Sequence, residues 1–340
     1  IRDDVESRGL GDVYKRQTKV LIGGSPYDET SKFNNFILHQ KNNAILKIID
    51  AQRVSAKKNG WGFVDFNEPM RKISLEEQKR DSTFTFCRVD RIHPDNDGQM
   101  VMAYLFLKAQ GLAGYEVSEF SIDAQHLDVI VHKNCKISKL KRGKKNLTFD
   151  YLAYALPYPL DSIPRHGWGN MKSQRDAMQL VPFMKEFNQE RFQVHNLEKG
   201  IYQLTIDDQY IDNLSSGQLM KGINLADYPT TPQYQQAMKI MYLNEERFEI
   251  EKRFREYLWT EYSFLRKEGP LFVDNQKAID KLQEYLPKDL FLRASYGWYI
   301  KAMHPEIRKV WKNYMNSIIE AIYKINKPVT HRVKLIRMEQ

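Results

Sequence analysis

The order strand, helix, strand near the start of the chain constrains its fold more than any other feature. Residues 19–22 form a short apolar run that ends at Gly23-Gly24, which is typical of a buried strand followed by a turn. Residues 42–58 carry apolar side chains at roughly helical spacing and end at Asn59-Gly60, and residues 62–66 form a second apolar run. We therefore expect the end of an open α/β sheet with crossover connections.

The character of the chain changes after Gly114. Before it, a polar turn and a buried helix over 100–109 complete the α/β part. After it come short strands, a Pro- and Gly-rich irregular stretch, a helix over 174–192 and a hairpin over 200–211. Long helices follow from Thr231 onwards, with Pro232 at the first helical position. We divide the chain into a non-native, adapter-like segment at 1–17, an α/β part at 18–114, a β-rich and irregular part at 115–229 and a helical part at 230–340.

Composition excludes several classes of protein. Of 340 residues, 42% are hydrophobic and 28% are charged, which is enough for a packed core and argues against wholesale disorder. Two cysteines, Cys87 and Cys135, allow one disulfide at most and rule out a Cys-rich zinc site. The histidines share no metal-ligand spacing, so we expect no metal. No apolar run approaches the ~20 residues that a membrane span needs.

The formal net charge is +9, which raises the question of a polyanionic partner. Most of the excess lies in one short stretch that contains no acidic residue: Lys133, Lys136, Lys139, Lys141, Arg142, Lys144 and Lys145. We interpret this basic cluster as a solvated hairpin tip, with a polyanion or membrane-surface patch as the alternative. No nucleic-acid-binding motif accompanies it, so we expect no nucleic acid partner.

The first seventeen residues do not read as a natural N-terminus. They lack an initiator Met, a signal-peptide pattern and an amphipathic period. They resemble the translated read-through of a sequencing adapter, as found in metagenomic gene models. We therefore expect the natural protein to begin upstream of Thr18, and the missing signal peptide says nothing about export.

The sharpest chemical signal is the sequence Asp90-Arg91-Ile92-His93-Pro94. An Asp three residues before a His can accept a hydrogen bond from Nδ1 and leave Nε2 facing a nucleophile. The spacing alone is weak evidence, because Asp123 and His126 share it in what we interpret as an ordinary strand-to-turn segment. From these residues alone, a structural turn and a catalytic turn stay equally open.

A family resemblance favours the catalytic interpretation. The stretch 20–28, the stretch 62–66 and the stretch 89–94 with Gly98 and Met102-Ala103 resemble the fourth strand, the fifth strand and the last block of the SGNH/GDSL hydrolase superfamily. Further pieces resemble the C-terminal extension of bacterial members: residues 155–161, 222–226, 231–233 and 326–331. The resemblance covers nearly everything after residue 18. It implies the C-terminal half of a flavodoxin-like three-layer α/β/α sandwich followed by a β-hairpin-containing and mainly helical extension.

The resemblance also implies roles and reveals departures. Asp90 corresponds to the orienting acid and His93 to the general base of a Ser-His-Asp esterase. The Gly-Asp-Ser nucleophile block, the oxyanion glycine and the Gly-x-Asn-Asp block of the family are missing, and Ser25 occupies a loop position, not that of the nucleophile. We therefore expect an ester hydrolase in the full-length parent and an inactive chain here. The family implies no cofactor, carbohydrate O-acetyl esters as substrates, and a periplasmic or secreted location.

Four residues are candidates for substrate binding. Pro26 and Tyr27 follow a strand's carboxyl end, where open α/β sheets bind ligands, and could form a wall of the acyl pocket. His166 and Trp168 lie in an irregular loop that could contact a sugar or be purely structural. The alternative function is a glycan- or protein-binding module on a degenerate hydrolase scaffold. The sequence leaves the oligomeric state open.

Overall fold

The computed structural model describes residues 18–33, 36–164 and 171–339, so the adapter-like segment and the loop with His166 and Trp168 lie outside the described residues. The chain forms two compact units. The first comprises residues up to 116 together with 160–189, and the second comprises 117–159 together with the residues from 190 onwards. The segment 160–189, which sequence analysis assigned to the extension, therefore belongs to the unit that carries Asp90 and His93.

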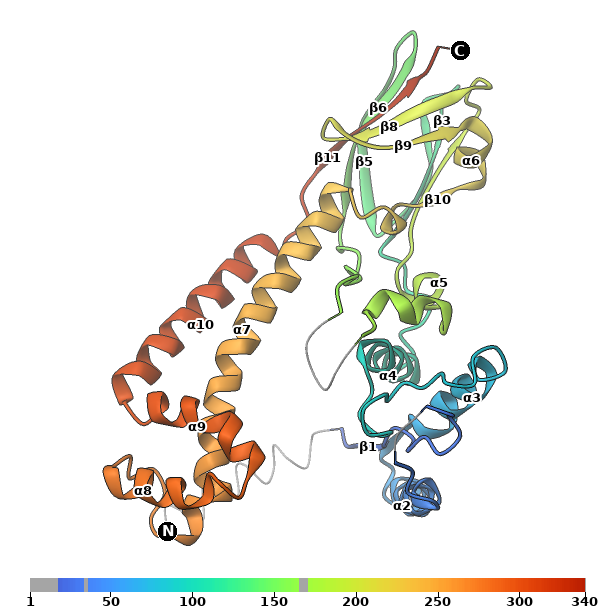
Figure 1. The fold of residues 1–340 in the computed structure, drawn as a ribbon. Helices are drawn as coiled ribbons and strands as arrows, with labels where there is room; N and C mark the ends of the chain where they lie inside the picture. The colour runs from blue at the N-terminus through green and yellow to red at the C-terminus, as the bar shows by residue number, and fades with distance from the viewer. Residues whose placement is uncertain (1–17, 34–35, 165–170, 340) are drawn as a thin grey trace. The chain divides into compact units, whose positions relative to one another are not determined.

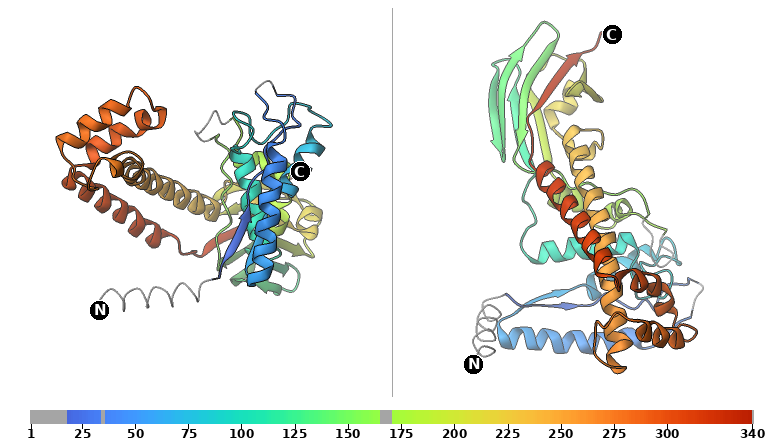
Figure 2. Two further views of the ribbon diagram at one scale, coloured as in Figure 1. Left: turned by 90° about the horizontal axis from the view of Figure 1, so that it is seen from below. Right: turned by 90° about the vertical axis from the view of Figure 1, so that its left-hand side faces the viewer.

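The first unit contains the expected strand, helix, strand. β1 (Val20–Gly23) and β2 (Gly62–Asp65) pair in parallel, and α2 (Lys41–Asn59) connects them and lies along the two strands (Figure 2). Gly60 ends α2 with a φ of 66°, a left-handed conformation that glycine adopts without strain. The polar stretch after β2 forms α3 (Asn67–Glu77). The parallel crossover predicted from hydrophobic patterning is confirmed.

The segment 160–189 packs its apolar side chains against α4 (Asn96–Ala109). α4 begins four residues earlier than predicted, because the Asp95 side chain accepts the first N–H of the helix. The predicted helix over 174–192 is wrong. Pro182 separates η1 (Gln174–Gln179) from the short α5 (Phe183–Phe187), and the residues after α5 form a strand of the second unit.

Gly98 permits a close contact at the start of α4. A Cβ placed there would lie 2.7 Å from Cβ of Pro94 and 3.2 Å from Cβ of Phe86. We expect Gly98→Ala to destabilise the protein by about 1–3 kcal/mol, because a packed backbone must move. The matched control is Gly297→Ala, where no atom lies within 4 Å of the added methyl group. This helix-interior change should stabilise by about 0.5–1 kcal/mol. Urea unfolding of both variants tests this contrast, and equal midpoints would contradict it.

The second unit contains a β-sandwich. Its four-stranded sheet has the order β10-β7-β3-β4, and its five-stranded sheet has the order β5-β6-β11-β8-β9. The strands of the first sheet are β3 (Ser118–Asp123), β4 (Asp128–Lys133), β7 (Glu190–His195) and β10 (Ile223–Asn224). Those of the second are β5 (Cys135–Arg142), β6 (Asn146–Ala153), β8 (Ile201–Ile206), β9 (Gln209–Ser215) and β11 (His331–Arg337). Inward-facing side chains of both sheets share one core, in which the rings of Phe120 and Phe192 stack at 4.8 Å.

The basic cluster is mainly a strand, not a hairpin tip. Most of it forms β5, an edge strand of the five-stranded sheet. Lysines on an edge strand discourage pairing with another chain. Four of its seven basic residues make ion pairs with acidic side chains: Lys133 with Glu119, Lys139 with Asp150, Arg142 with Glu198, and Lys145 with Glu339. Because acidic side chains already neutralise these four residues, the ion pairs favour a solvated surface over a polyanion site.

Helices fill much of the rest of the second unit. They are α6 (Ser216–Lys221), α7 (Pro232–Ser263), α8 (Gln276–Tyr285), α9 (Leu290–Ala302) and α10 (Pro305–Ile325), and α7 and α10 lie side by side (Figure 1). The prediction that the helical part extends to residue 340 is wrong. After α10 the chain forms β11, which pairs with both β6 and β8. Its alternating buried residues fit a strand in a packed sheet.

Cys87 and Cys135 are both buried and free. Among the described residues, none of the helices is long and apolar enough to cross a membrane.

Candidate active site

Asp90 and His93 face each other across a tight turn. Asp90 Oδ1 accepts the backbone N–H groups of Ile92 (3.1 Å) and His93 (2.9 Å), while Oδ2 contacts Nδ1 of the His93 ring. Burial raises the pKa of Asp90, but the hydrogen bonds from His93 and Ile92 outweigh it and hold that pKa below its ordinary value. The His93 ring keeps 61% of its side-chain surface exposed. An ionised carboxylate thus orients an accessible imidazole, as a general base requires.

The second Asp-x-x-His sequence makes the same contacts. Asp123 Oδ1 accepts the N–H groups of Gln125 and His126, and Oδ2 lies 2.9 Å from Nδ1 of His126. The hydrogen bond that its ring donates to Asp123 raises the pKa of His126. This turn follows β3, as the sequence predicted. The spacing therefore produces an Asp–His pair in both turns, and only the surroundings distinguish a catalytic pair from a structural one.

Arg91 supplies the clearest difference between the two turns, and sequence reasoning missed it. It is 1% exposed and has a φ of 65°. Its guanidinium donates to the carbonyls of Asp28 (2.9 Å), Ser31 (3.1 Å) and Phe33 (2.6 Å). Its own carbonyl accepts the N–H of Asp28 at 2.8 Å. The loop that follows β1 is thereby fixed to the residue between Asp90 and His93.

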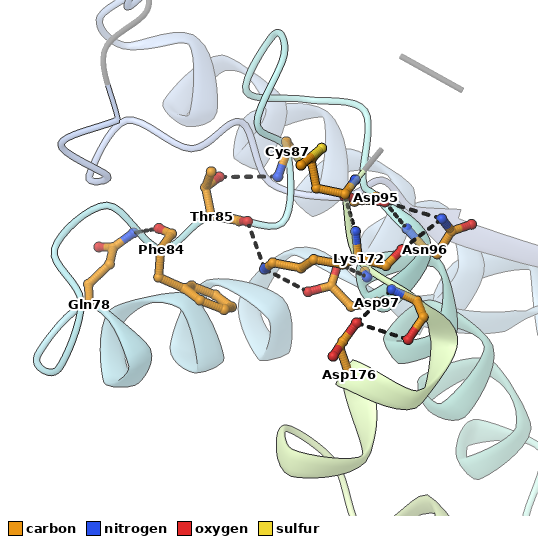
Figure 3. A network of polar contacts seen from close by, with 12 residues as sticks. Gln78, Phe84, Thr85, Cys87, Asp95, Asn96, Asp97, Lys172 and Asp176 are labelled. Atoms are coloured by element: carbon orange, nitrogen blue, oxygen red, sulfur yellow. Dashed lines mark hydrogen bonds and ion pairs between the residues drawn. The ribbon is translucent and has the colours of Figure 1, made fainter. Parts of the chain in front are cut away.

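The residues just after His93 contact the segment that begins at Met171; Figure 3 shows the part of this network around Asp95, Asp97 and Lys172. Asp95 Oδ2 accepts the backbone N–H groups of Met171 and Lys172. Nζ of Lys172 lies 2.8 Å from Oδ2 of Asp97 and 4.2 Å from the centre of the Phe84 ring. Burial raises the pKa of Asp97, and Lys172 offsets only part of that effect. Residues 171 and 172 thus help to fix the start of α4, three positions after His93.

Removing the Lys172 charge is expected to destabilise this unit. Lys172→Met leaves the Asp97 carboxylate, 1% exposed, without its cation, which typically costs about 3–5 kcal/mol. The loss should be smaller at pH 5 than at pH 8, because a carboxyl group whose pKa is raised can take up a proton. Adding Asp97→Asn should restore much of the stability. Urea midpoints at both pH values measure this effect.

A surface pair provides the control for that experiment. Lys72 contacts Glu68 on an exposed helix face, where an ion pair is worth about 0–1 kcal/mol. Lys72→Met should therefore change the midpoint little at either pH. Equal effects of the two lysine substitutions would show that the Lys172–Asp97 pair behaves as an exposed one.

A cavity of about 150 Å³ lies beside the loop that Arg91 holds. Pro26 and Tyr27 both line it, as do Asp28, Glu29, Thr30, Asn42, Asn43, Arg71 and Ser74. The Tyr27 N–H donates to Asn42 Oδ1, and its hydroxyl accepts the N–H of Leu38. Pro26 and Tyr27 thus lie in a cavity wall, and their contact with substrate stays a prediction.

The remaining candidates have structural partners or lie outside the described part. Ser25 Oγ donates a hydrogen bond to the carbonyl of Ile92 at 3.2 Å. This bond connects the loop that follows β1 to the turn of Asp90 and His93. His166 and Trp168 lie outside the described residues. Within 18–33, 36–164 and 171–339, no group of three or more His, Cys, Asp or Glu side chains could hold a metal ion.

Comparison with known proteins identifies the helical part and then the whole chain. Residues 238–327 match the family described as the diltiazem deacetylase C-terminal helical domain. A solved structure, "BT4096 a gut microbial diltiazem-metabolizing enzyme", is 46% identical with a TM-score of 0.90, and the match covers 99% of this chain and 77% of that one. No curated protein matches the chain.

The chain therefore belongs to the diltiazem deacetylase family. It is a homologue of a diltiazem-metabolizing enzyme. The mixed α/β architecture with a C-terminal helical domain is shared with that enzyme over 99% of this chain. Neither comparison assigns a role to an individual residue.

Proposed function

We propose that this protein hydrolyses acetyl esters of small molecules by SGNH-type acyl transfer, with His93 as general base and Asp90 as its orienting acid. The observation that carries the proposal is the Asp90–His93 pair, an ionised carboxylate against an accessible imidazole. Membership of a deacetylase family supports ester hydrolysis as the reaction class.

His93 and Asp90 would divide the work as follows. Nε2 of His93 takes the proton of a serine hydroxyl while that oxygen attacks the ester carbonyl, and then gives the proton to the leaving alcohol. His93 next takes a proton from the water that attacks the acetyl-serine, and returns it to the serine oxygen as acetate leaves. Asp90 holds Nδ1 and stabilises the imidazolium that forms. We propose no nucleophile within the 340 residues, because none of their serines stands in a Gly-Asp-Ser block.

Sequence analysis predicts that the 340-residue chain is inactive. The match to the diltiazem-metabolizing enzyme covers 99% of this chain and does not support that prediction. The test is therefore direct. Acetate release is measured for the 340 residues as printed, and for the same residues joined to the part of the diltiazem-metabolizing enzyme that the match leaves uncovered. Release by the first form would show that the printed chain is active; release by the second form alone would support its expected inactivity.

The substrate panel separates the two proposed substrate classes. Diltiazem and 4-nitrophenyl acetate represent small-molecule esters, and an O-acetylated oligosaccharide represents the carbohydrate esters that the SGNH resemblance suggests. We expect faster release from the small molecules, because the chain resembles a diltiazem-metabolizing enzyme. Absence of acetate release from both forms on every substrate would contradict the proposal.

A further inference from the structure

The Arg91 side chain connects the Asp90–His93 pair with the loop that carries the predicted wall of the acyl pocket. On one side lie Asp90 and His93, its neighbours in the chain. On the other lies the loop 28–33, whose carbonyls accept its guanidinium N–H groups at 2.6–3.1 Å. The loop begins where Asp28 and its neighbours line the cavity. The Arg91 side chain thus joins the cavity wall to the Asp–His turn, beside the Ser25 hydroxyl, which donates to the Ile92 carbonyl.

The Asp–His pair itself does not need this guanidinium. Asp90 holds the turn through backbone N–H groups of Ile92 and His93, without a contribution from the Arg91 side chain. The second turn forms the same contacts around Asp123 with Ala124 in the position that Arg91 occupies in the first turn. The guanidinium therefore serves the loop, and its effect on the pair is secondary.

The backbone at Arg91 shows that this placement is held against a local preference. A φ of 65° is unfavourable for a side chain with a Cβ and suits glycine. A strained residue persists only where its surroundings fix it. Here the hydrogen bonds of the buried guanidinium, together with the N–H donated to the Cys87 carbonyl at 3.0 Å, do so. A glycine would relieve the backbone and remove the side chain alone.

We propose that Arg91 is a positioning residue that sets the cavity wall Tyr27–Thr30 against the Asp90–His93 pair and so determines which acyl group the esterase accepts. This inference rests on the proposed function. It assigns Arg91 no contact with substrate. Loss of the Arg91 side chain should move the wall Tyr27–Thr30 and leave the Asp90–His93 pair in place. We therefore expect a larger change in substrate binding and acyl selectivity than in the chemical step.

The central experiment compares Arg91→Gly and Arg91→Lys with the unchanged protein, in the form that releases acetate. For 4-nitrophenyl acetate, KM of Arg91→Gly should rise about tenfold while kcat changes less than about threefold. Its preference for acetate over butyrate esters should fall by about the same factor. Arg91→Lys keeps the charge but not the planar set of donors, so its KM and its acyl preference should lie between those of Arg91→Gly and those of the unchanged protein. Guanidinium chloride at low concentration should restore KM of Arg91→Gly, and sodium chloride should not.

A merely structural role would give a different pattern. Loss of folded protein lowers the apparent kcat and leaves KM and acyl preference unchanged. That outcome for both variants would overturn the proposal, as would an unchanged KM in a stable Arg91→Gly protein. If Arg91→Gly does not fold, Arg91→Lys decides by the same split between KM and kcat.

A readout without activity separates this inference from the proposed function. Hydrogen exchange of the peptide 24–33, measured by mass spectrometry, should accelerate in Arg91→Gly, because the carbonyls of Asp28, Ser31 and Phe33 lose the guanidinium that holds the loop, although the Asp28 N–H keeps the backbone carbonyl of residue 91. Peptides from β6 should be unchanged. If exchange accelerates as expected but His93→Gln leaves acetate release intact, the proposed function fails while the Arg91 anchor stands. Unchanged exchange in 24–33 overturns the anchor itself.

Discussion

Replacing His93 with Gln is expected to lower kcat/KM for acetate release by about 10⁴–10⁶, since removal of a triad base typically has an effect of this size. Gln keeps a polar side chain of similar reach but cannot accept and return a proton. The Asp90 contacts with backbone N–H groups remain, so the turn should survive. Steady-state kinetics on the acetate-releasing form, with the melting temperature recorded beside it, measures the effect.

The chain offers its own matched control. His126→Gln removes an imidazole that has the same spacing, the same partner type and a similar exposure, 68% against 61% for His93. It lies in the other compact unit. We expect less than about a twofold change in kcat/KM, as for a surface substitution. If both substitutions reduce activity equally, or neither does, His93 is not the general base.

The second large effect concerns Glu190 and the stability of the sandwich unit. Glu190 is fully buried at the start of β7, where Oε1 accepts Tyr151 OH (2.7 Å) and Gln233 Nε2 (2.9 Å). Oε2 has no hydrogen-bond partner in the described part of the chain. Burial raises the pKa of Glu190 to about 7, although the hydrogen bonds of Tyr151 and Gln233 oppose the rise. The carboxyl group is therefore protonated in the fold at mildly acidic pH.

This raised pKa predicts a loss of stability with rising pH. Between the ordinary pKa of 4.5 and the folded value of about 7, the unfolded chain releases the Glu190 proton and the folded protein keeps it. The contribution is fully present below pH 4.5 and declines until the pH passes about 7, by about 3 kcal/mol in total. Glu190→Gln, a neutral isostere, should remove this slope and be the more stable protein at pH 8.

Urea midpoints from pH 4.5 to 8 test the prediction. Glu246→Gln on the exposed face of α7 is the matched control and should follow the unchanged protein at every pH. A Glu190→Gln protein with the same pH slope as the unchanged protein would show that Glu190 does not titrate in this range.

Local patterns predicted the elements that depend on neighbours in sequence. Gly60 ends α2 at the position that the Asn59-Gly60 pair predicts. The Asp90–His93 contacts also depend on a short turn, so their spacing sufficed to predict them. The prediction of one continuous helix over 174–192 failed, because Pro182 interrupts the helical spacing of its apolar residues.

The tertiary structure decided what depends on distant partners. β11 is a strand because β6 and β8 supply its hydrogen bonds, more than a hundred residues away in sequence. Lys172 belongs beside Asp97, 75 residues earlier, because a buried carboxylate needs a cation. Arg91 is buried because three loop carbonyls accept its guanidinium. The sequence by itself determined the order strand, helix, strand of β1, α2 and β2, the Asp–His turn and the long helices. Each of these follows from patterns among residues that are close together in the chain. Folding decided which Asp–His turn has an anchored cavity wall, because that distinction rests on contacts about 60 residues apart in the chain.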